Sequence, residues 1–140
     1  MLLEKELTRR ILQCAYEVHS ILGPGLFENI YEECLYLQLN KRGLYVERQK
    51  PIPVYFEELR HETGFRADLI VEKKVIIEIK AIEYIVERHK AQILTYLRFS
   101  ECQVGLMLNF NSASLRDGIY RYANTKLLPS DSTPGEEQRF

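Results

Sequence analysis

The sequence has few cysteines and no long apolar run. Its three cysteines, Cys14, Cys34 and Cys102, are odd in number and far apart, and none forms a C-x-x-C pair. The pattern therefore favours reduced, buried thiols over a disulfide framework or a zinc knuckle. No apolar run is long enough to cross a bilayer, and no signal peptide is recognisable at the N-terminus. We expect a cytoplasmic protein with no membrane partner.

An excess of charge of one sign is also missing. The chain has 19 lysines and arginines against 20 acids, a net charge of −1, so no global basic field attracts nucleic acid. This balance counts against a tight non-specific nucleic-acid binder, but it is compatible with an enzyme that uses a metal and a local basic patch. A P-loop is absent as well, because Gly23-Pro24-Gly25 is not followed by Lys-Ser/Thr. A hydrolase of small phosphorylated metabolites is therefore the least favoured enzyme class.

The length and composition predict one globular domain. With 140 residues, 46% of them hydrophobic and 28% charged, the chain is long enough to bury a core and has the usual composition of a soluble protein. We expect this domain to cover residues 1–124. From residue 125 the sequence is rich in Pro, Ser, Gly and Glu, which predicts a disordered tail over residues 125–140.

Hydrophobic periodicity predicts an α/β fold with a mixed sheet. Helices are predicted over residues 4–22, 26–42 and about 86–99, and strands over residues 45–57, 64–71, 75–81 and 103–110, with a short strand or helical turn at 115–122. Residues 57–63 are predicted to form a polar turn, and Pro51 and Pro53 favour an edge strand or a bulge. The order is α-α-β-β-β-α-β. The last helix is a crossover that permits a parallel pair of strands on either side of it.

The predicted hairpin over residues 64–80 carries the strongest functional signal. Asp68, Glu78 and Lys80 interrupt its apolar runs. A charge inside a hydrophobic strand is costly unless it is paired or bound to a metal. Because side chains alternate across a strand, Glu78 and Lys80 share one face and lie roughly 7 Å apart along it. Three such charges in one hairpin indicate a site.

The length of the hairpin turn decides whether Asp68 joins that site. A two-residue turn would pair Asp68 with Ile79 and put it on the wrong face, because a slip of one residue reverses every side chain. A three-residue connection over residues 72–74 pairs Asp68 with Glu78, and residues directly opposite each other share a face. A functional site therefore predicts a connection of odd length or a bulge.

Two adjacent carboxylates repel each other unless a cation lies between them. They supply hard oxygen ligands, which suit Mg²⁺, with Mn²⁺ as a substitute. A metal lowers the pKa of an attacking water, and a nearby lysine holds that water or stabilises a phosphoryl oxygen. These parts suit the hydrolysis of a phosphodiester. The alternative is a structural ion pair of Lys80 with Glu78 or Asp68, because the pattern D-x₉-E-x-K alone is loose.

Five motifs in a fixed order resemble a known family. They are EVHSILGPG (17–25), GLFENIY (25–31), GFRADL (64–69), IEIKA (77–81) and AQILTYL (91–97). Together with the element order they resemble the PD-(D/E)XK nuclease superfamily, which has the restriction-endonuclease-like fold. More closely, the chain is similar to the bacterial and archaeal GxxExxY protein family over about residues 5–124. Ala67 stands where the superfamily's name has proline, a common departure that does not touch the chemistry.

The resemblance implies the metal ligands and the catalytic lysine. Asp68 and Glu78 match the superfamily's metal-binding acids, and the backbone carbonyl of Ile79 is expected to be a further ligand. Lys80 matches the catalytic lysine. No catalytic position is lost, which argues against an inactive relative.

The resemblance also implies three supporting residues. Glu28 matches the acid that many members contribute from the first core helix, as an outer metal ligand or an orienting group. Position alone gives it a simpler explanation, because a carboxylate in the first turn of a helix is favoured by the helix dipole. Gln92 and Tyr96 match a Q-x-x-x-Y element of exonuclease-like members, in which the glutamine helps to order the site.

The leading hypothesis is a Mg²⁺-dependent nuclease that acts on DNA or RNA. Basic residues near the hairpin or the third predicted helix are candidate phosphate contacts: Arg66, Lys73, Lys74, Arg88, Lys90 and Arg98. The alternative is a non-catalytic module on the same fold that binds nucleic acid or assembles with itself, for instance as a symmetric homodimer.

Overall fold

The structure, a computed structural model, describes residues 4–124 and 137–139. Its elements follow one another as α1 (Lys5–Leu22), α2 (Glu28–Lys41), β1 (Val46–Phe56), β2 (Leu59–Val71), β3 (Val75–Lys80), α3 (Glu87–Ser100), β4 (Val104–Asn109), the short 3₁₀ helix η1 (Leu115–Gly118), β5 (Ile119–Ala123) and β6 (Glu137–Arg139). No helix of this described part is long and apolar enough to span a membrane.

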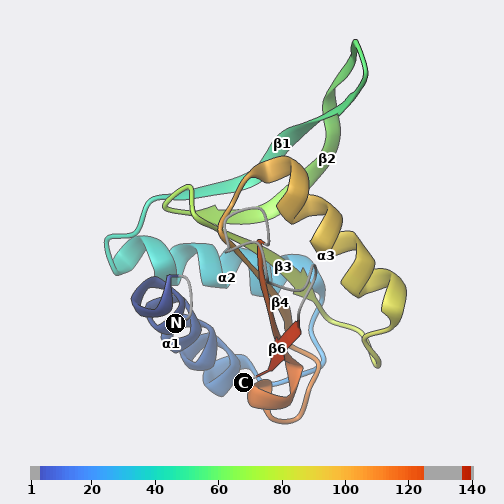
Figure 1. The fold of residues 1–140 in the computed structure, drawn as a ribbon. Helices are drawn as coiled ribbons and strands as arrows, with labels where there is room; N and C mark the ends of the chain where they lie inside the picture. The colour runs from blue at the N-terminus through green and yellow to red at the C-terminus, as the bar shows by residue number, and fades with distance from the viewer. Residues whose placement is uncertain (1–3, 125–136, 140) are drawn as a thin grey trace.

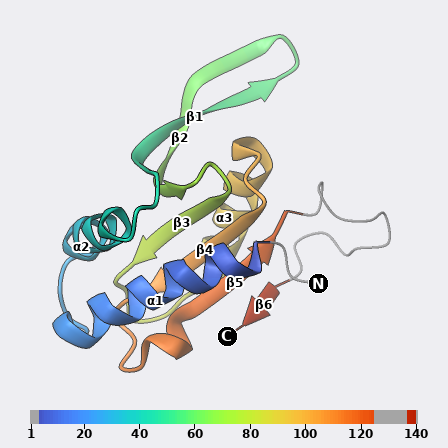
Figure 2. The same ribbon diagram turned by 90° about the vertical axis from the view of Figure 1, so that its left-hand side faces the viewer.

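The strands form one mixed sheet in the order β1-β2-β3-β4-β5-β6, and the helices cover both of its faces (Figures 1 and 2). Strands β3 and β4 are parallel, and the other neighbours are antiparallel. Helix α3 is the crossover between the two parallel strands, as the sequence predicts. The observed order α-α-β-β-β-α-β confirms the predicted fold class.

Strand β3 separates two hydrophobic cores. Its residues Val75, Ile77 and Ile79 pack on the face covered by α1 and α2, whereas Ile76 packs on the face covered by α3. All four are fully buried. A strand that is apolar on both faces is typical of the centre of a sheet with two covering layers. This is why Glu78, between Ile77 and Ile79, lies inside the protein.

The hairpin of β2 and β3 has the predicted odd-length connection. Val71 pairs with Val75 and Leu69 pairs with Ile77, so residues 72–74 form a three-residue turn. Glu72 and Lys73 in this turn have φ angles of 53° and 56°. Continuing this register by one residue places Asp68 opposite Glu78, as the functional hypothesis requires.

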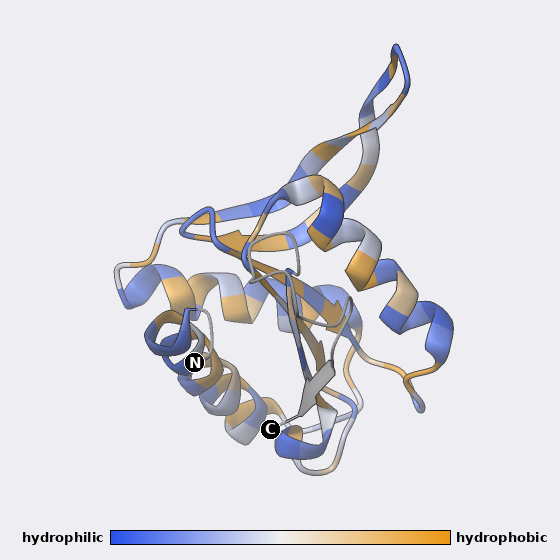
Figure 3. Cartoon of the chain, in the orientation of Figure 1, coloured by the Kyte–Doolittle hydropathy of each residue, from blue (hydrophilic) through white to orange (hydrophobic). Residues whose placement is uncertain are grey.

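The connection between β1 and β2 differs from the prediction. The polar turn expected over residues 57–63 is wrong from residue 59 onward, because β2 begins there and only residues 57–58 form the turn. The two strands extend beyond the body of the sheet as a two-stranded arm (Figure 1), along which hydrophobic and hydrophilic residues are mixed (Figure 3). An uncovered ribbon has solvent on both sides, so its strands lack the alternating pattern that identifies a half-buried strand.

The prolines mark an edge strand, as predicted. Strand β1 lies at one edge of the sheet, and its register against β2 shifts between Ile52 and Val54. Pro53 lies at this shift. A proline has no N–H to donate to a neighbouring strand, so an edge or a bulge is where it fits.

The predicted disordered tail lies mostly outside the described residues, which exclude 125–136 and 140. Within it, residues Glu137–Arg139 instead form β6, which pairs antiparallel with β5. Strand β5 would otherwise present an edge of unpaired backbone groups, and pairing satisfies them.

Candidate active site

The candidate site lies where β2 and β3 separate. The backbone pairing of the two strands ends at Leu69 and Ile77. Two residues further along β3, the N–H of Ile79 donates a hydrogen bond of 2.8 Å to Oδ2 of Asp68. A side-chain oxygen thus satisfies a backbone donor inside the sheet. The same bond fixes the Asp68 carboxylate beside the backbone of β3.

Glu78 is buried next to Asp68 without a partner for one of its oxygens. Only 5% of its surface is exposed, and its Oε1 has no hydrogen-bond partner among the residues that the structure describes. Burial, followed by the negative charge of Asp68, raises the pKa of the Glu78 carboxyl to about 9. A buried acid beside a second acid is unfavourable without a compensating cation. A bound metal ion would supply such a positive charge.

The donor set fits a hard divalent cation. Among the described residues, no group of three or more His, Cys, Asp or Glu side chains is placed to hold a metal. Mg²⁺ does not need such a cage, because it keeps several waters and is commonly bound by one or two carboxylates and a substrate phosphate. Asp68 and Glu78 are two carboxylates that could hold such an ion, and the Ile79 carbonyl stays the predicted backbone ligand.

Lys80 of β3 contacts Gln92 of α3. The Lys80 ammonium donates to Oε1 of Gln92 at 3.3 Å. Within the described part of the chain, Lys80 forms no ion pair with Asp68 or Glu78. The arrangement therefore does not support the structural ion pair that was the alternative explanation of these charges.

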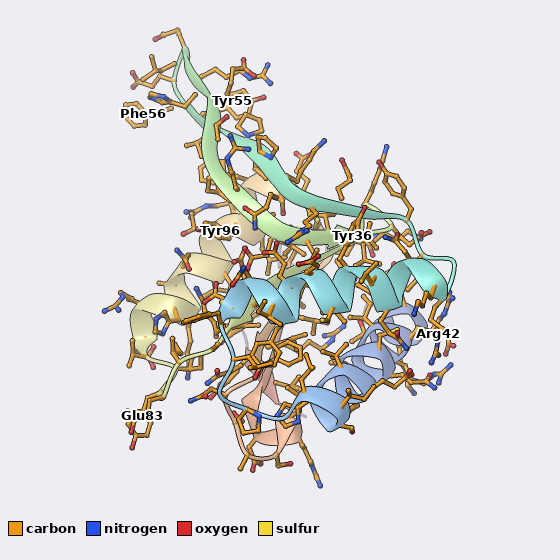
Figure 4. The ribbon with its side chains drawn as sticks, turned by 180° about the vertical axis from the view of Figure 1, so that it is seen from behind. Tyr36, Arg42, Tyr55, Phe56, Glu83 and Tyr96 are labelled. Carbon is orange, nitrogen blue, oxygen red and sulfur yellow. The ribbon has the colours of Figure 1, made fainter. Side chains whose placement is uncertain are left out.

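Tyr96 lies one turn after Gln92 on α3 and stacks on Phe65 of β2. The two rings are 3.9 Å apart and almost parallel, with an angle of 2°. Burial, followed by the charge of Glu78, raises the pKa of the Tyr96 hydroxyl. Seen from behind, the part of α3 near Tyr96 lies between the arm and the N-terminal end of α2 (Figure 4). The stacked pair joins α3 to the hairpin and keeps Gln92 over the site.

Glu28 approaches the same site from the first turn of α2. Burial by surrounding protein, followed by the charge of Asp68, raises the pKa of its carboxyl, and Lys80 lowers it in part. The side chain is thus close enough to feel both charges. The structure brings these predicted residues near one another: Glu28, Asp68, Glu78, Lys80, Gln92 and Tyr96. Their roles stay a prediction.

The G-x-x-E-x-x-Y motif fixes where α2 begins. Gly25 has a φ of 104°, a conformation that favours glycine. The buried ring of Tyr31 stacks on Phe110 at 4.7 Å. Its hydroxyl accepts a hydrogen bond of 3.1 Å from the N–H of Leu26 and donates one of 2.5 Å to the carbonyl of Gly23. The motif tyrosine therefore anchors the turn that presents Glu28.

Replacing Tyr31 with phenylalanine is expected to destabilise the protein by about 1–3 kcal/mol, because the turn loses both hydrogen bonds while the ring stays packed. Urea denaturation measures this change. Tyr16→Phe is the matched control, because Tyr16 is 39% exposed on α1 and lies outside the motif. Equal stability of Tyr31→Phe and wild type would show that the turn does not depend on the hydroxyl.

Asp68 is supported by three residues that the sequence analysis did not assign to the site: Gln49, Glu32 and Arg48. Nε2 of Gln49 donates to Oε1 of Glu32 at 2.7 Å and to Oδ1 of Asp68 at 3.2 Å. Glu32 is 6% exposed and pairs with Arg48 at 2.7 Å. Gln49 has a φ of 52° in the middle of β1, an unfavourable backbone for a non-glycine residue. Such strain is typical of functional sites. In the sequence, the only indication of these three residues was that Glu32 follows Glu28 by four residues on the same helix.

Replacing Gln49 with alanine is expected to weaken binding of Mn²⁺ about tenfold, because residues that orient a ligand typically have effects of this size. Titration calorimetry measures the affinity. Gln38→Ala is a matched control, because Gln38 also donates to a glutamate, Glu17, at 2.6 Å, but between α1 and α2. Unchanged affinity in Gln49→Ala would remove Gln49 from the metal site.

Lys73 and Lys74 do not lie at the site. They belong to the turn that precedes β3, at the opposite end of this strand from Lys80. Lys73 lies 5.9 Å from the centre of the Tyr45 ring, and Lys74 is 4.0 Å from Glu4. Their proximity in sequence to Asp68 and Glu78 was misleading, because a six-residue strand spans about 17 Å from first to last residue.

The other basic residues are spread over the surface around β2 and α3. Arg66 is exposed on β2, two residues before Asp68, and Arg88 is exposed in the first turn of α3. Lys90 lies 3.7 Å from Glu87 and over the Tyr120 ring of β5. Arg98 lines a hollow at the base of the arm.

Comparison with known proteins agrees with this geometry. The family model described as the PD-(D/E)XK nuclease superfamily matches residues 5–122, from the start of α1 into β5. Neither the curated proteins nor the solved structures gave a match. The matched region contains the hairpin, the helices on both sides of it and every residue of the candidate site. The chain belongs to the PD-(D/E)XK nuclease superfamily.

Proposed function

We propose that this protein is a Mg²⁺-dependent nuclease that hydrolyses phosphodiester bonds in DNA or RNA, with Mn²⁺ as a possible substitute metal. The observation that carries the proposal is the buried, partly unpartnered carboxylate of Glu78 beside Asp68. Lys80, held by Gln92, is two residues further along the same strand. Superfamily membership supports the same chemistry.

Each side chain has a defined task in this proposal. Asp68 and Glu78 hold the metal, which when bound lowers the pKa of a water and neutralises charge on the phosphate. Lys80 places a fixed positive charge where a phosphoryl oxygen becomes more negative. Gln92 accepts a hydrogen bond from Lys80 and so orients it. Glu28, whose pKa is raised first by burial and then by the charge of Asp68, orients water at the site.

We further assign the chain to the GxxExxY family within this superfamily. Support comes from the structural reason for the motif: its first residue allows the turn, its glutamate faces the site, and its tyrosine anchors the turn from inside the core. A motif that positions an acid of the site is expected to belong to the function of the family.

A non-catalytic binding or self-assembling module is the second candidate. The arm supports it, because Tyr55, Phe56 and Leu59 near the tip are all more than half exposed. Figure 4 shows Tyr55 and Phe56 at the outer end of the arm, away from the body of the protein. Exposed apolar groups of this kind often mark a surface for a partner, such as nucleic acid or a second copy of the chain.

A cleavage assay separates the two candidates. The purified protein is incubated with single-stranded and double-stranded DNA and RNA in Mg²⁺, in Mn²⁺ and in a chelator. We expect cleavage with either metal, none with the chelator, and a loss of about a hundredfold or more in Lys80→Ala. Lys74→Ala, at the far end of β3, is the control and should cleave like wild type. Cleavage that survives the chelator, or no cleavage of any substrate, would contradict the proposal.

A further inference from the structure

Two large aromatic side chains are exposed beside the candidate site. Phe27 is 81% exposed and comes directly before Glu28, and Tyr84 is 73% exposed and follows Lys80 by four residues. One precedes α2 and the other lies in the loop between β3 and α3. The segments that carry the two rings meet at Phe110, which follows β4. The Tyr31 ring stacks on Phe110 at 4.7 Å, and the N–H of Phe110 donates a hydrogen bond of 2.9 Å to the carbonyl of Lys80.

The turn that carries Phe27 is held firmly by the core. The Tyr31 hydroxyl bonds to the backbone of Gly23 and Leu26, on the N-terminal side of Phe27. The carbonyl of Phe27 accepts a hydrogen bond of 3.1 Å from the N–H of Ile30. The ring is therefore exposed on a fixed backbone, and it has no loop freedom with which to fold back into the protein.

The loop that carries Tyr84 is fixed at both ends. The side chain of Asn109 accepts a hydrogen bond of 3.2 Å from the N–H of Ile82 and donates one of 2.9 Å to its carbonyl. At the other end, Nδ1 of His89 accepts a hydrogen bond of 3.0 Å from the N–H of Val86. Two anchored segments thus hold the exposed rings, Phe27 directly before Glu28 and Tyr84 four residues after Lys80.

The charges around these rings do not favour a duplex. Lys80 and Arg88 are near them in the chain, but so are Glu28, Glu83 and Glu87. Duplex binding depends on many phosphate contacts from basic residues, and the residues near these two rings include no excess of basic over acidic side chains. Exposed aromatic rings bind nucleic acid in another way, because they stack on the faces of bases that are not paired within a helix.

We propose that Phe27 and Tyr84 are stacking platforms for unpaired bases next to the phosphate held at Asp68, Glu78 and Lys80. The inference rests on the proposed nuclease function and adds the substrate class: single-stranded nucleic acid. Base faces inside a duplex are covered by their neighbours and are not accessible to these rings.

Binding of a fluorescent oligonucleotide tests the proposal. A strand of about twelve nucleotides and a hairpin of equal length are compared by anisotropy in Mg²⁺, with Lys80→Ala as the parent protein so that the strand stays intact. We expect the unpaired strand to bind about tenfold tighter than the hairpin, and Phe27→Ala and Tyr84→Ala each to weaken that binding about tenfold. Phe27→Tyr and Tyr84→Phe should bind like the parent. Ile21→Ala is the control, because Ile21 is 83% exposed on α1.

Several results would overturn the inference. They are equal binding of strand and hairpin, alanine variants that bind like the parent, and no binding of either probe. A change in mass by light scattering in the alanine variants, without a change in strand binding, would instead identify the rings as an interface between copies. If the rings support strand binding but the protein with Lys80 never cleaves, the nuclease proposal alone fails. If duplex cleavage proceeds without dependence on the rings, the stacking inference alone fails.

Discussion

Replacing Asp68 with asparagine is expected to lower the proposed cleavage rate by about a thousandfold or more, because the variant would lose a charged ligand of the proposed metal, which would activate water. Asparagine keeps an oxygen of similar shape for the N–H of Ile79, which Asp68 binds at 2.8 Å. The fold should therefore survive. Cleavage of a labelled oligonucleotide in Mg²⁺, beside a circular dichroism spectrum, measures both effects.

The control for this variant is Glu83→Gln, which removes an acid from the neighbouring loop. In Figure 4 the Glu83 side chain points away from the body of the protein. This variant is expected to cleave like wild type. Full activity of a folded Asp68→Asn protein would show that Asp68 is not a metal ligand in the reaction.

Replacing Glu78 with glutamine is expected to stabilise the metal-free protein. Burial and the neighbouring Asp68 raise the pKa of Glu78 from 4.5 to about 9, so the folded state holds a proton that the unfolded state releases. The stabilising contribution of this proton is complete below pH 4.5 and is lost as the pH rises toward about 9. At neutral pH, Glu78→Gln avoids this loss and should melt about 5 °C higher than wild type.

The pH dependence provides the decisive measurement for this variant. In the presence of a chelator, the melting temperature of wild type should fall between pH 4.5 and about 9 more steeply than that of Glu78→Gln. Added Mg²⁺ should raise the melting temperature of wild type and leave the variant unchanged. Parallel curves for the two proteins would contradict the raised pKa.

Another buried acid gives a contrasting control. Glu32→Gln should destabilise the protein, because Glu32 is paired with Arg48 at 2.7 Å and bonded to Gln49. Removing one partner of an ion pair costs stability, whereas removing an acid that has no cation relieves an unfavourable burial. Opposite signs for Glu78→Gln and Glu32→Gln are therefore expected.

The hairpin could be predicted from sequence because the number of residues in its turn decides which side chains share a face. Strand side chains alternate with a period of two, so the requirement that Asp68 face Glu78 demanded a connection of odd length. The structure has three residues there. The faces of β3 follow from the same rule. Glu28, Gln92 and Tyr96 depended on the resemblance to a family, because periodicity alone does not say which helix faces meet the hairpin.

The hydrogen bonds that hold the Asp68 carboxylate could not be predicted because they depend on tertiary contacts. Gln49 reaches Glu32 and Asp68 through a backbone conformation that no sequence pattern indicates for glutamine. Residues 59–63 of the arm were missed for a related reason, since a ribbon without a covering layer carries no hydrophobic period. Lys73 shows the reverse case: it is close to the site in sequence but lies at the other end of β3 from Lys80, and its contact with phosphate stays a prediction.

The central claim is that Asp68 and Glu78 together hold one divalent cation. Calorimetric titration of the purified protein with Mn²⁺ tests it most directly, with wild type measured beside the Asp68→Asn/Glu78→Gln double variant. We expect wild type to bind a metal ion at this site and the double variant to lose that binding while keeping its fold. Equal binding by both proteins, or no binding by wild type, would contradict the claim.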